Sequence, residues 1–194
     1  MARTEDWRGL ELVRTPDLHS KRGRSARIPL AAPLAYDKCK LPIDPYILGL
    51  WLGDGHSADG RITIGDEDWD FLSAEIRRRG YEVGERNGAK AATVYGIRPV
   101  LRSIGVLNDK HIPLMYLRSP LGQRIDLLRG LVDSDGYVPA SGQIEICRTD
   151  RHLADGVVEL VLSLGVRCTM STGRATLYGK DCGAKYRIVF YYQH

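Results

Sequence analysis

The chain has 194 residues, of which 43% are hydrophobic and 27% charged, and its formal net charge is +4. These values are typical of a soluble globular protein, and no apolar run approaches the ~20 residues that a membrane-spanning helix needs. The N-terminus lacks the apolar core of a secretory signal and the four cysteines form no Cys-x-x-Cys pair, so we expect an intracellular protein with reduced thiols and no structural zinc.

Residues 1–44 form a distinct basic region. The segment from Arg14 to Lys40 contains seven basic residues and two acidic ones, a net charge of +5. The whole chain carries +4, so the remaining residues sum to −1. Its prolines interrupt any long helix. Such a segment either contacts nucleic acid through the phosphates or is a solvated arm. The nucleic-acid contacts that we predict in it are Lys21, Arg22, Arg24 and Arg27.

A buried helix is predicted to begin at Pro45. Proline suits the first turn of a helix, Asp44 can cap it, and the sequence is apolar almost all round. The helix ends at Gly53-Asp54-Gly55. The following pattern predicts a strand at 61–65, a helix capped by Asp66 and reaching 79, strands near 81–86 and 91–97, and short helices at 99–104 and after 113.

The same order of elements then recurs. An apolar helix is predicted at 121–132, ending in Asp133-Ser134-Asp135-Gly136. A strand at 143–148 alternates in polarity, and Thr149 or Asp150 caps a helix that reaches 164. Strand-like stretches follow near 166–172, 174–178 and 186–192. Each half therefore reads helix, strands, helix, strands, and the second copy is shorter.

The two long helices carry matching segments, YILGLWLGDG at 46–55 and LLRGLVDSDG at 127–136. Small residues four apart, Gly49 with Gly53 and Gly130 with Ser134, lie on one helix face and allow two backbones to approach closely. If the helices pack through these faces, their ends meet. The acids that follow, Asp54 and Asp135, 81 positions apart, then lie side by side.

Two carboxylates brought together need a cation or a proton between them. At about 4 Å they repel by about 4 kcal/mol in an effective dielectric of 20. Hard divalent ions such as Mg²⁺ prefer oxygen ligands, and metal bound in this way can activate water against a phosphodiester. A single Asp-Gly is a common turn dipeptide. The matched pair, rather than either segment alone, favours a metal site.

Both segments resemble the LAGLIDADG motif of homing endonucleases, most closely the intein-encoded type. Residues 108–117, NDKHIPLMYL, resemble the block between the two motifs, and the resemblance covers 41–192. It implies an α+β fold in which two pseudo-symmetric αββαββα halves form a DNA-binding saddle of antiparallel sheets. The halves are 45–119 and 120–194, after the basic extension 1–44, and the protein is expected to be a monomer.

The resemblance also implies an activity and its residues. We expect a site-specific endonuclease that cleaves both strands of a long DNA target with Mg²⁺, for which Mn²⁺ can substitute, and leaves 3′ overhangs. The predicted catalytic residues are Asp54, Asp135, Lys110 and, as a second lysine, Lys185. The predicted metal ligands are Asp54, Asp135, Gly53 and Ser134. Lys180 is an alternative to Lys185, or the two strands are cut unequally.

Alternation along the predicted strands indicates which side chains face DNA. Arg, Gln, Ser and Thr can read base edges in the major groove, although any antiparallel sheet may simply have a solvated face. The predicted contacts on the strands and turns are Arg61, Thr63, Lys90, Gln143, Glu145, Arg167, Thr169, Ser171, Arg174, Thr176 and Tyr178. His56 is interpreted as a turn histidine, and His111 as a support for the Lys110 loop.

The sequence offers two alternative functions. The sequence is also consistent with a non-cleaving DNA-binding protein of the same fold, such as a regulator or maturase-like module. The presence of both acids at the metal positions favours the enzyme. A nucleotide-binding enzyme using the glycines at 49, 53 and 55 is disfavoured because these lie within a helix. Without an N-terminal Cys or Ser after Met1, or a terminal His-Asn pair, protein splicing is not expected. The expected location is the cytoplasm or nucleoid of a bacterial or phage-infected cell.

Overall fold

The computed structural model describes residues 31–192. In chain order its first elements are α1 (Pro45–Asp54), β1 (Arg61–Thr63), α2 (Trp69–Arg78), β2 (Ala91–Thr93), α3 (Ile97–Ser103) and α4 (Leu114–Leu117). The others are α5 (Leu121–Asp135), β3 (Gly136–Tyr137), β4 (Gln143–Arg148), α6 (Arg151–Ser163), β5 (Cys168–Leu177) and β6 (Lys180–Tyr191). The predicted contacts Lys21, Arg22, Arg24 and Arg27 lie outside the described residues.

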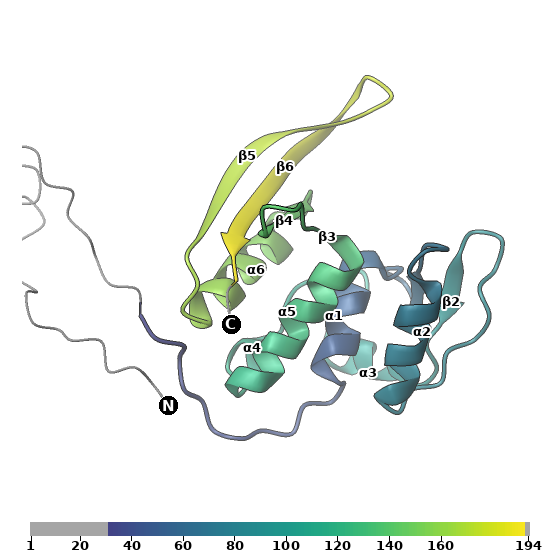
Figure 1. Cartoon of the computed structure of the whole chain (residues 1–194). Helices are drawn as coiled ribbons and strands as arrows, with labels where there is room; N and C mark the ends of the chain where they lie inside the picture. The colour runs from purple at the N-terminus through teal and green to yellow at the C-terminus, as the bar shows by residue number, and fades with distance from the viewer. Residues whose placement is uncertain (1–30, 193–194) are drawn as a thin grey trace, which may run out of the picture.

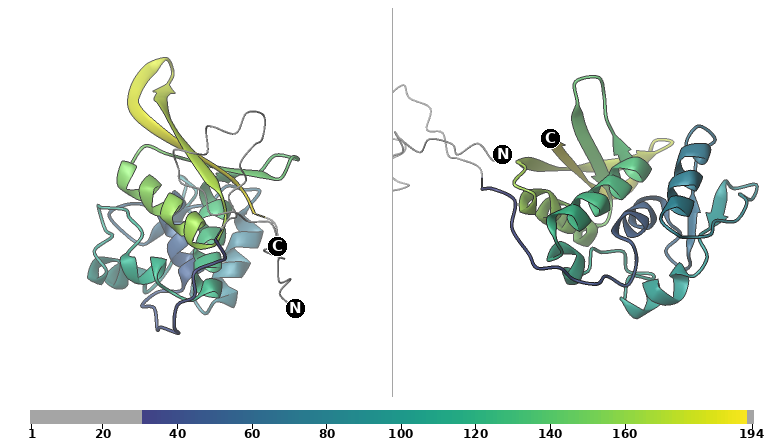
Figure 2. Two further views of the ribbon diagram at one scale, coloured as in Figure 1. Left: turned by 90° about the vertical axis from the view of Figure 1, so that its left-hand side faces the viewer. Right: turned by 60° about the horizontal axis from the view of Figure 1, so that its bottom comes forward.

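Two antiparallel sheets flank a central pair of helices. In Figure 1, α1 and α5 lie side by side, with α2 and β2 on one side and α6 and the larger sheet on the other. The smaller sheet has two strands, β1-β2, and the larger has four in the order β3-β4-β6-β5. The β5–β6 hairpin projects well beyond the helices (Figure 2). The predicted α+β class with antiparallel sheets is confirmed, while the two sheets differ in extent.

Close approach of α1 and α5 depends on their small residues. A β-carbon added at Gly49 would lie 2.3 Å from the Leu127 carbonyl oxygen, and one added at Gly130 would lie 2.1 Å from the Tyr46 carbonyl oxygen. At Gly53 an added β-carbon would lie 1.9 Å from Ser134 Oγ. The helices therefore touch backbone to backbone, as the four-residue spacing predicted.

Two of the three helix caps predicted from the sequence are confirmed. Asp44 accepts a 2.9 Å hydrogen bond from the Tyr46 amide, and Asp150 accepts one of 2.8 Å from the Leu153 amide. Asp66, the predicted cap of the second helix, does not cap it, because α2 begins only at Trp69. The Asp66 carboxylate instead pairs with two basic side chains that follow it in the chain.

The strands differ from the prediction in extent. Residues 81–86 form no strand, only an isolated bridge between Val83 and Val94. The predicted strands 166–172 and 174–178 are one strand, β5, because Gly173 pairs opposite Lys185 and does not end the pairing. A register shift follows Arg174, and the hairpin turns at 178–179.

Within 31–192, the structure has no helix that combines the length and the apolar character needed to cross a bilayer.

The segment before α1 is held against α5 and α6 by hydrogen bonds. Arg124 of α5 is fully buried and donates to the carbonyl oxygens of Ser119, Ser163 and Leu34. The Leu34 amide donates to Ser163 at 2.9 Å, so this segment is fastened to the end of α6.

Candidate active site

The two motif acids are the last residues of the paired helices. Asp54 ends α1 and Asp135 ends α5, and both side chains are partly buried. The pKa of Asp54 is raised from 3.8 to about 6, first by burial and then by the nearby carboxylate of Asp135. The helix contact thus brings Asp135 close enough to oppose ionisation of Asp54.

Lys110 lies against the end of α1. A helix C-terminus presents carbonyl oxygens that have no partner in the helix. Lys110 Nζ donates to three of them, Gly55 at 2.6 Å, Leu52 at 3.2 Å and Gly53 at 3.4 Å. Burial lowers the pKa of Lys110 from 10.5 to about 8, and the positive charge of Arg148 lowers it further. The predicted catalytic lysine therefore belongs to the same site as the acids.

Arg148, the last residue of β4, was missed by the sequence reasoning. It forms an ion pair with Asp135 and donates to the carbonyl oxygens of Leu52 and Gly53. It stands two residues after Ile146, so alternation puts it on the apolar side of the strand. A charged residue on that side needs a buried partner, and this signal was available in the sequence.

The residues at the helix ends fit a hard divalent cation. The carboxylates of Asp54 and Asp135 and the backbone carbonyl of Gly53 offer the oxygen donors that Mg²⁺ prefers. Ser134 differs, because its hydroxyl donates to the Gly130 carbonyl oxygen at 2.8 Å within its own helix and packs against Gly53. Its side chain serves the helix contact, and a ligand role for it stays a prediction.

A cavity of about 390 Å³ opens beside this cluster. Asp135, Arg148 and Lys110 line one part of it, and Asp109 and Leu153 line another. Lys185, the predicted second lysine, lies in β6 opposite Gly173. The basic side chain that pairs with Asp135 is instead that of Arg148. A catalytic role for Lys185 stays a prediction.

One face of the larger sheet collects four of the predicted DNA contacts. Glu145 and Thr169 both lie opposite Val189 of β6, one on either side of it. Gln143 and Ser171 are two residues further along the same strands, so they share that face. Thr169 and Ser171 are exposed, and Glu145 and Gln143 are half-buried. The face combines hydroxyl, amide and carboxylate groups.

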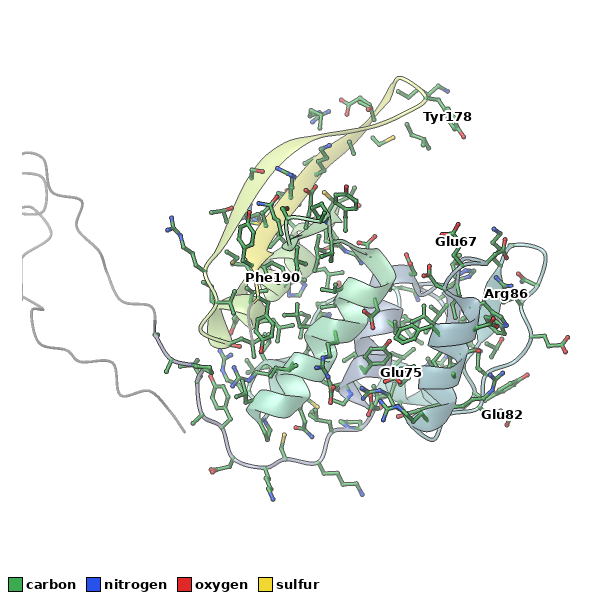
Figure 3. All side chains as sticks on the ribbon, in the orientation of Figure 1. Glu67, Glu75, Glu82, Arg86, Tyr178 and Phe190 are labelled. Carbon is green, nitrogen blue, oxygen red and sulfur yellow. The ribbon has the colours of Figure 1, made fainter. Side chains whose placement is uncertain are left out.

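Other candidates of the larger sheet are spread along it. Arg167 is exposed and precedes β5. Arg174 forms an ion pair with Asp181 and lies opposite Ala184, in the alternate phase from the exposed hydroxyls at 169 and 171. Thr176 follows the register shift, and Tyr178, 97% exposed, stands at the hairpin tip (Figure 3).

The candidates of the first half each have a local partner. Arg61 forms an ion pair with Asp59 at 2.7 Å. Lys90, in the turn before β2, forms one with Asp66 at 2.7 Å. Thr63 Oγ1 lies 3.3 Å from the ring of His56, which is thus a hydrogen-bonded histidine as interpreted from the sequence. Any contact of these residues with a ligand would exchange an existing interaction for a new one.

Comparison with known proteins gives matches over most of the chain. Residues 122–189 match the family model of the LAGLIDADG-like domain, which includes the second motif. The chain is 40% identical over 149 residues to the replicative DNA helicase DnaB of Mycobacterium intracellulare, covering 76% of this chain and 23% of that protein. It is 26% identical over 166 residues to the homothallic switching endonuclease of Saccharomyces cerevisiae, covering 67% and 28%.

A third relative is an iron-sulfur cluster assembly SufBD family protein of Mycobacterium leprae, 27% identical over 146 residues, covering 68% of this chain and 17% of that protein. The chain thus spans less than a third of the length of these relatives.

Solved structures show the same architecture. A variant of I-DmoI in complex with its target DNA, in the presence of Mn, is 17% identical with a TM-score of 0.50, over 77% of this chain and 86% of that one. Mesophilic variants of the homing endonuclease I-DmoI match with the same identity and TM-score over 77% and 88%. The chain therefore has the fold of the homing endonuclease I-DmoI, and its residues 122–189 are similar to the LAGLIDADG-like domain.

Proposed function

We propose that the chain is a site-specific DNA endonuclease of the LAGLIDADG homing type. The observation that carries the proposal is the meeting of two carboxylates, Asp54 and Asp135, at paired helix ends, with Lys110 and Arg148 beside them. An antiparallel sheet with an exposed polar face extends from the same elements. The yeast relative is named an endonuclease, and the I-DmoI structure contains target DNA, which supports the same class of substrate here.

The residues at the helix ends have separable tasks in this proposal. Asp54, Asp135 and the Gly53 carbonyl would hold Mg²⁺, or Mn²⁺ in its place. Bound metal of this kind supplies an activated water and offsets negative charge on the phosphodiester. The guanidinium of Arg148 pairs with Asp135, so it orients that carboxylate and adds positive charge to the site. Lys110, with a pKa of about 8, can both hold positive charge toward a phosphate and exchange a proton near neutral pH.

The two acids are supported by different cations. Lys110 contacts the end of α1, whereas Arg148 pairs with Asp135 and also reaches the end of α1. We propose cleavage of both strands, with the 3′ overhangs that the resemblance to homing endonucleases implies, and with unequal rates for the two strands. A lysine can exchange its proton and an arginine cannot, so the two half-sites differ in the chemistry available to them.

The relatives support an inserted module of the intein-encoded type. They carry names of three unrelated activities, a helicase, an endonuclease and an iron-sulfur assembly protein, yet share this segment as a minority of their length. A segment common to such proteins is more simply a mobile insertion than a part of each host activity. We propose that this chain acts as a monomer with halves 45–119 and 120–194. We propose the cytoplasm or nucleoid of a bacterial or phage-infected cell as its location.

Selection from a library of long duplexes tests the proposal. The parent protein and Asp155→Asn, a matched change of an exposed acid on α6, should make double-strand breaks with Mg²⁺. Asp54→Asn and Asp135→Asn should bind the selected duplex without breaking it. Cleavage by these two variants at the parental rate would refute the site. If the parent binds DNA with a steep salt dependence but never cuts with Mg²⁺ or Mn²⁺, the non-cleaving DNA-binding function holds instead.

A further inference from the structure

A cluster of three ligand-type side chains lies outside the pair of motif acids. Asp109 and His111 belong to the loop between α3 and α4, and His152 is the second residue of α6. One ligand atom from each of the three lies within 4.8 Å of the others. The imidazole rings stack with centroids 4.9 Å apart and planes inclined by 10°. The loop and α6 thus present their histidines to each other.

The hydrogen bonding of His111 leaves one ring nitrogen free to bind. Its Nδ1 lies 2.8 Å from the Asp109 carbonyl oxygen, which can only accept, so Nδ1 carries the proton and donates. The lone pair is then on Nε2. Metal-binding histidines usually donate their other ring nitrogen to a carbonyl or carboxylate in this way. The loop therefore holds His111 in the tautomer whose Nε2 can bind a metal.

We propose that Asp109, His111 and His152 form a second metal site, for Zn²⁺, which fastens the loop that carries Lys110 to α6. Two imidazoles and a carboxylate suit Zn²⁺ and leave a coordination position for water. The all-oxygen pair of motif acids suits Mg²⁺ instead. Four ligand atoms about 2 Å from a tetrahedral ion lie about 3.3 Å apart, so the three side chains must close by up to about 1.5 Å. A metal lies in the plane of each imidazole that binds it, so one of the two stacked rings must also rotate. Asp109 and His152 are exposed and free to make that adjustment.

The surroundings give this site a structural consequence. Ile112 is buried and packs 3.5 Å from the position of a β-carbon on Gly156, so the loop already rests on α6. Lys110 stands between two of the proposed ligands and donates to the end of α1. Zn²⁺ would therefore restrain the Lys110 loop from its other side, and it would stabilise the folded chain by mass action.

Titration calorimetry with Zn²⁺ on the full chain tests the site, in the background of Asp54→Asn with Asp135→Asn so that the motif acids cannot bind. One Zn²⁺ per chain should bind, Mg²⁺ should not compete, and Zn²⁺ should raise the Tm. Losing a group that only orients a ligand costs about 10–100-fold in metal affinity, and His152→Ala and His111→Gln should each cost more than that. Co²⁺ should give visible absorption bands that the same variants abolish.

Two matched controls separate this site from other ligands. Cys147→Ser removes a thiol that lines the same cavity as Asp109, the one beside the motif acids. His56→Ala removes a histidine outside the cluster. Both should bind Zn²⁺ like their parent. Circular dichroism checks that every variant is folded, and His152 is exposed, so its substitution leaves the core intact. The proposal is overturned if the parent binds no Zn²⁺, or if the histidine variants bind it as tightly as the controls. DNA cleavage enters none of these readouts.

Discussion

Substitution of Gly49 by Ala perturbs the contact on which the site depends. The new methyl group would lie 2.3 Å from the Leu127 carbonyl oxygen and 2.9 Å from the Leu131 amide nitrogen, whereas ordinary contact begins at 3.4 Å. Both obstacles are backbone atoms, so α1 and α5 must separate by roughly 1 Å. Overpacking of this kind costs about 1–3 kcal/mol, and the gain in helix propensity returns at most about 1 kcal/mol. We expect a net loss of about 1–2 kcal/mol.

The measurement is equilibrium urea denaturation at neutral pH, with Gly122→Ala as the matched control. Gly122 lies in α5 and is exposed, and an added β-carbon there meets no atom within 4 Å. Its substitution should be neutral or stabilise the fold by up to about 1 kcal/mol. Gly49→Ala should lower the denaturation midpoint with an unchanged slope. If the two variants are equally stable, the backbone-to-backbone contact of α1 and α5 is refuted.

Four further predictions concern charged groups. Because the folded state raises the pKa of Asp54 to about 6, its contribution to stability is complete below the ordinary value of 3.8 and is lost as the pH rises through 6. Asp54→Asn should therefore stabilise the metal-free chain above pH 6 by about 1–2 kcal/mol, after allowance for solvent screening, and should have no such effect below pH 4 in urea titrations. Since Mg²⁺ needs the ionised carboxylate, its affinity measured by calorimetry should fall about tenfold for each unit below pH 6. Removing Arg148, whose charge lowers the pKa of Asp54, should move that fall to higher pH, and an unmoved profile would refute their coupling. Arg124→Ala leaves buried carbonyl groups without a donor and should cost about 2–4 kcal/mol, against less than about 1 kcal/mol for the exposed Arg118→Ala.

Local signals in the sequence were enough to predict the central helix pair of the fold. Asp44 and Asp150 cap their helices, and the four-residue spacing of Gly49 and Gly53 predicts the helix contact, because both depend on neighbours within one or two turns. The same spacing predicts which two acids meet. These features could be read without knowing where the rest of the chain lies.

Features that depend on distant partners could not be read in the same way. Residues 81–86 have the composition of a strand, yet the extent of pairing depends on what lies opposite, and only Val83 forms a bridge. Gly173 resembles a strand end but is held within β5 by Lys185 across the hairpin. Arg148 could have been noticed as a charge on an apolar face, but its partner, Asp135, is fixed only by the tertiary fold.

Binding of Mn²⁺, followed by electron paramagnetic resonance near pH 7.5, probes the cation site at the ends of α1 and α5. Mn²⁺ prefers oxygen ligands, so it reports on the carboxylates of Asp54 and Asp135 rather than on histidines. We expect the parent and Asp155→Asn to remove free Mn²⁺ from solution, and Asp54→Asn and Asp135→Asn each to weaken this binding strongly. Equal Mn²⁺ binding by all four proteins would contradict a shared cation site at the ends of α1 and α5.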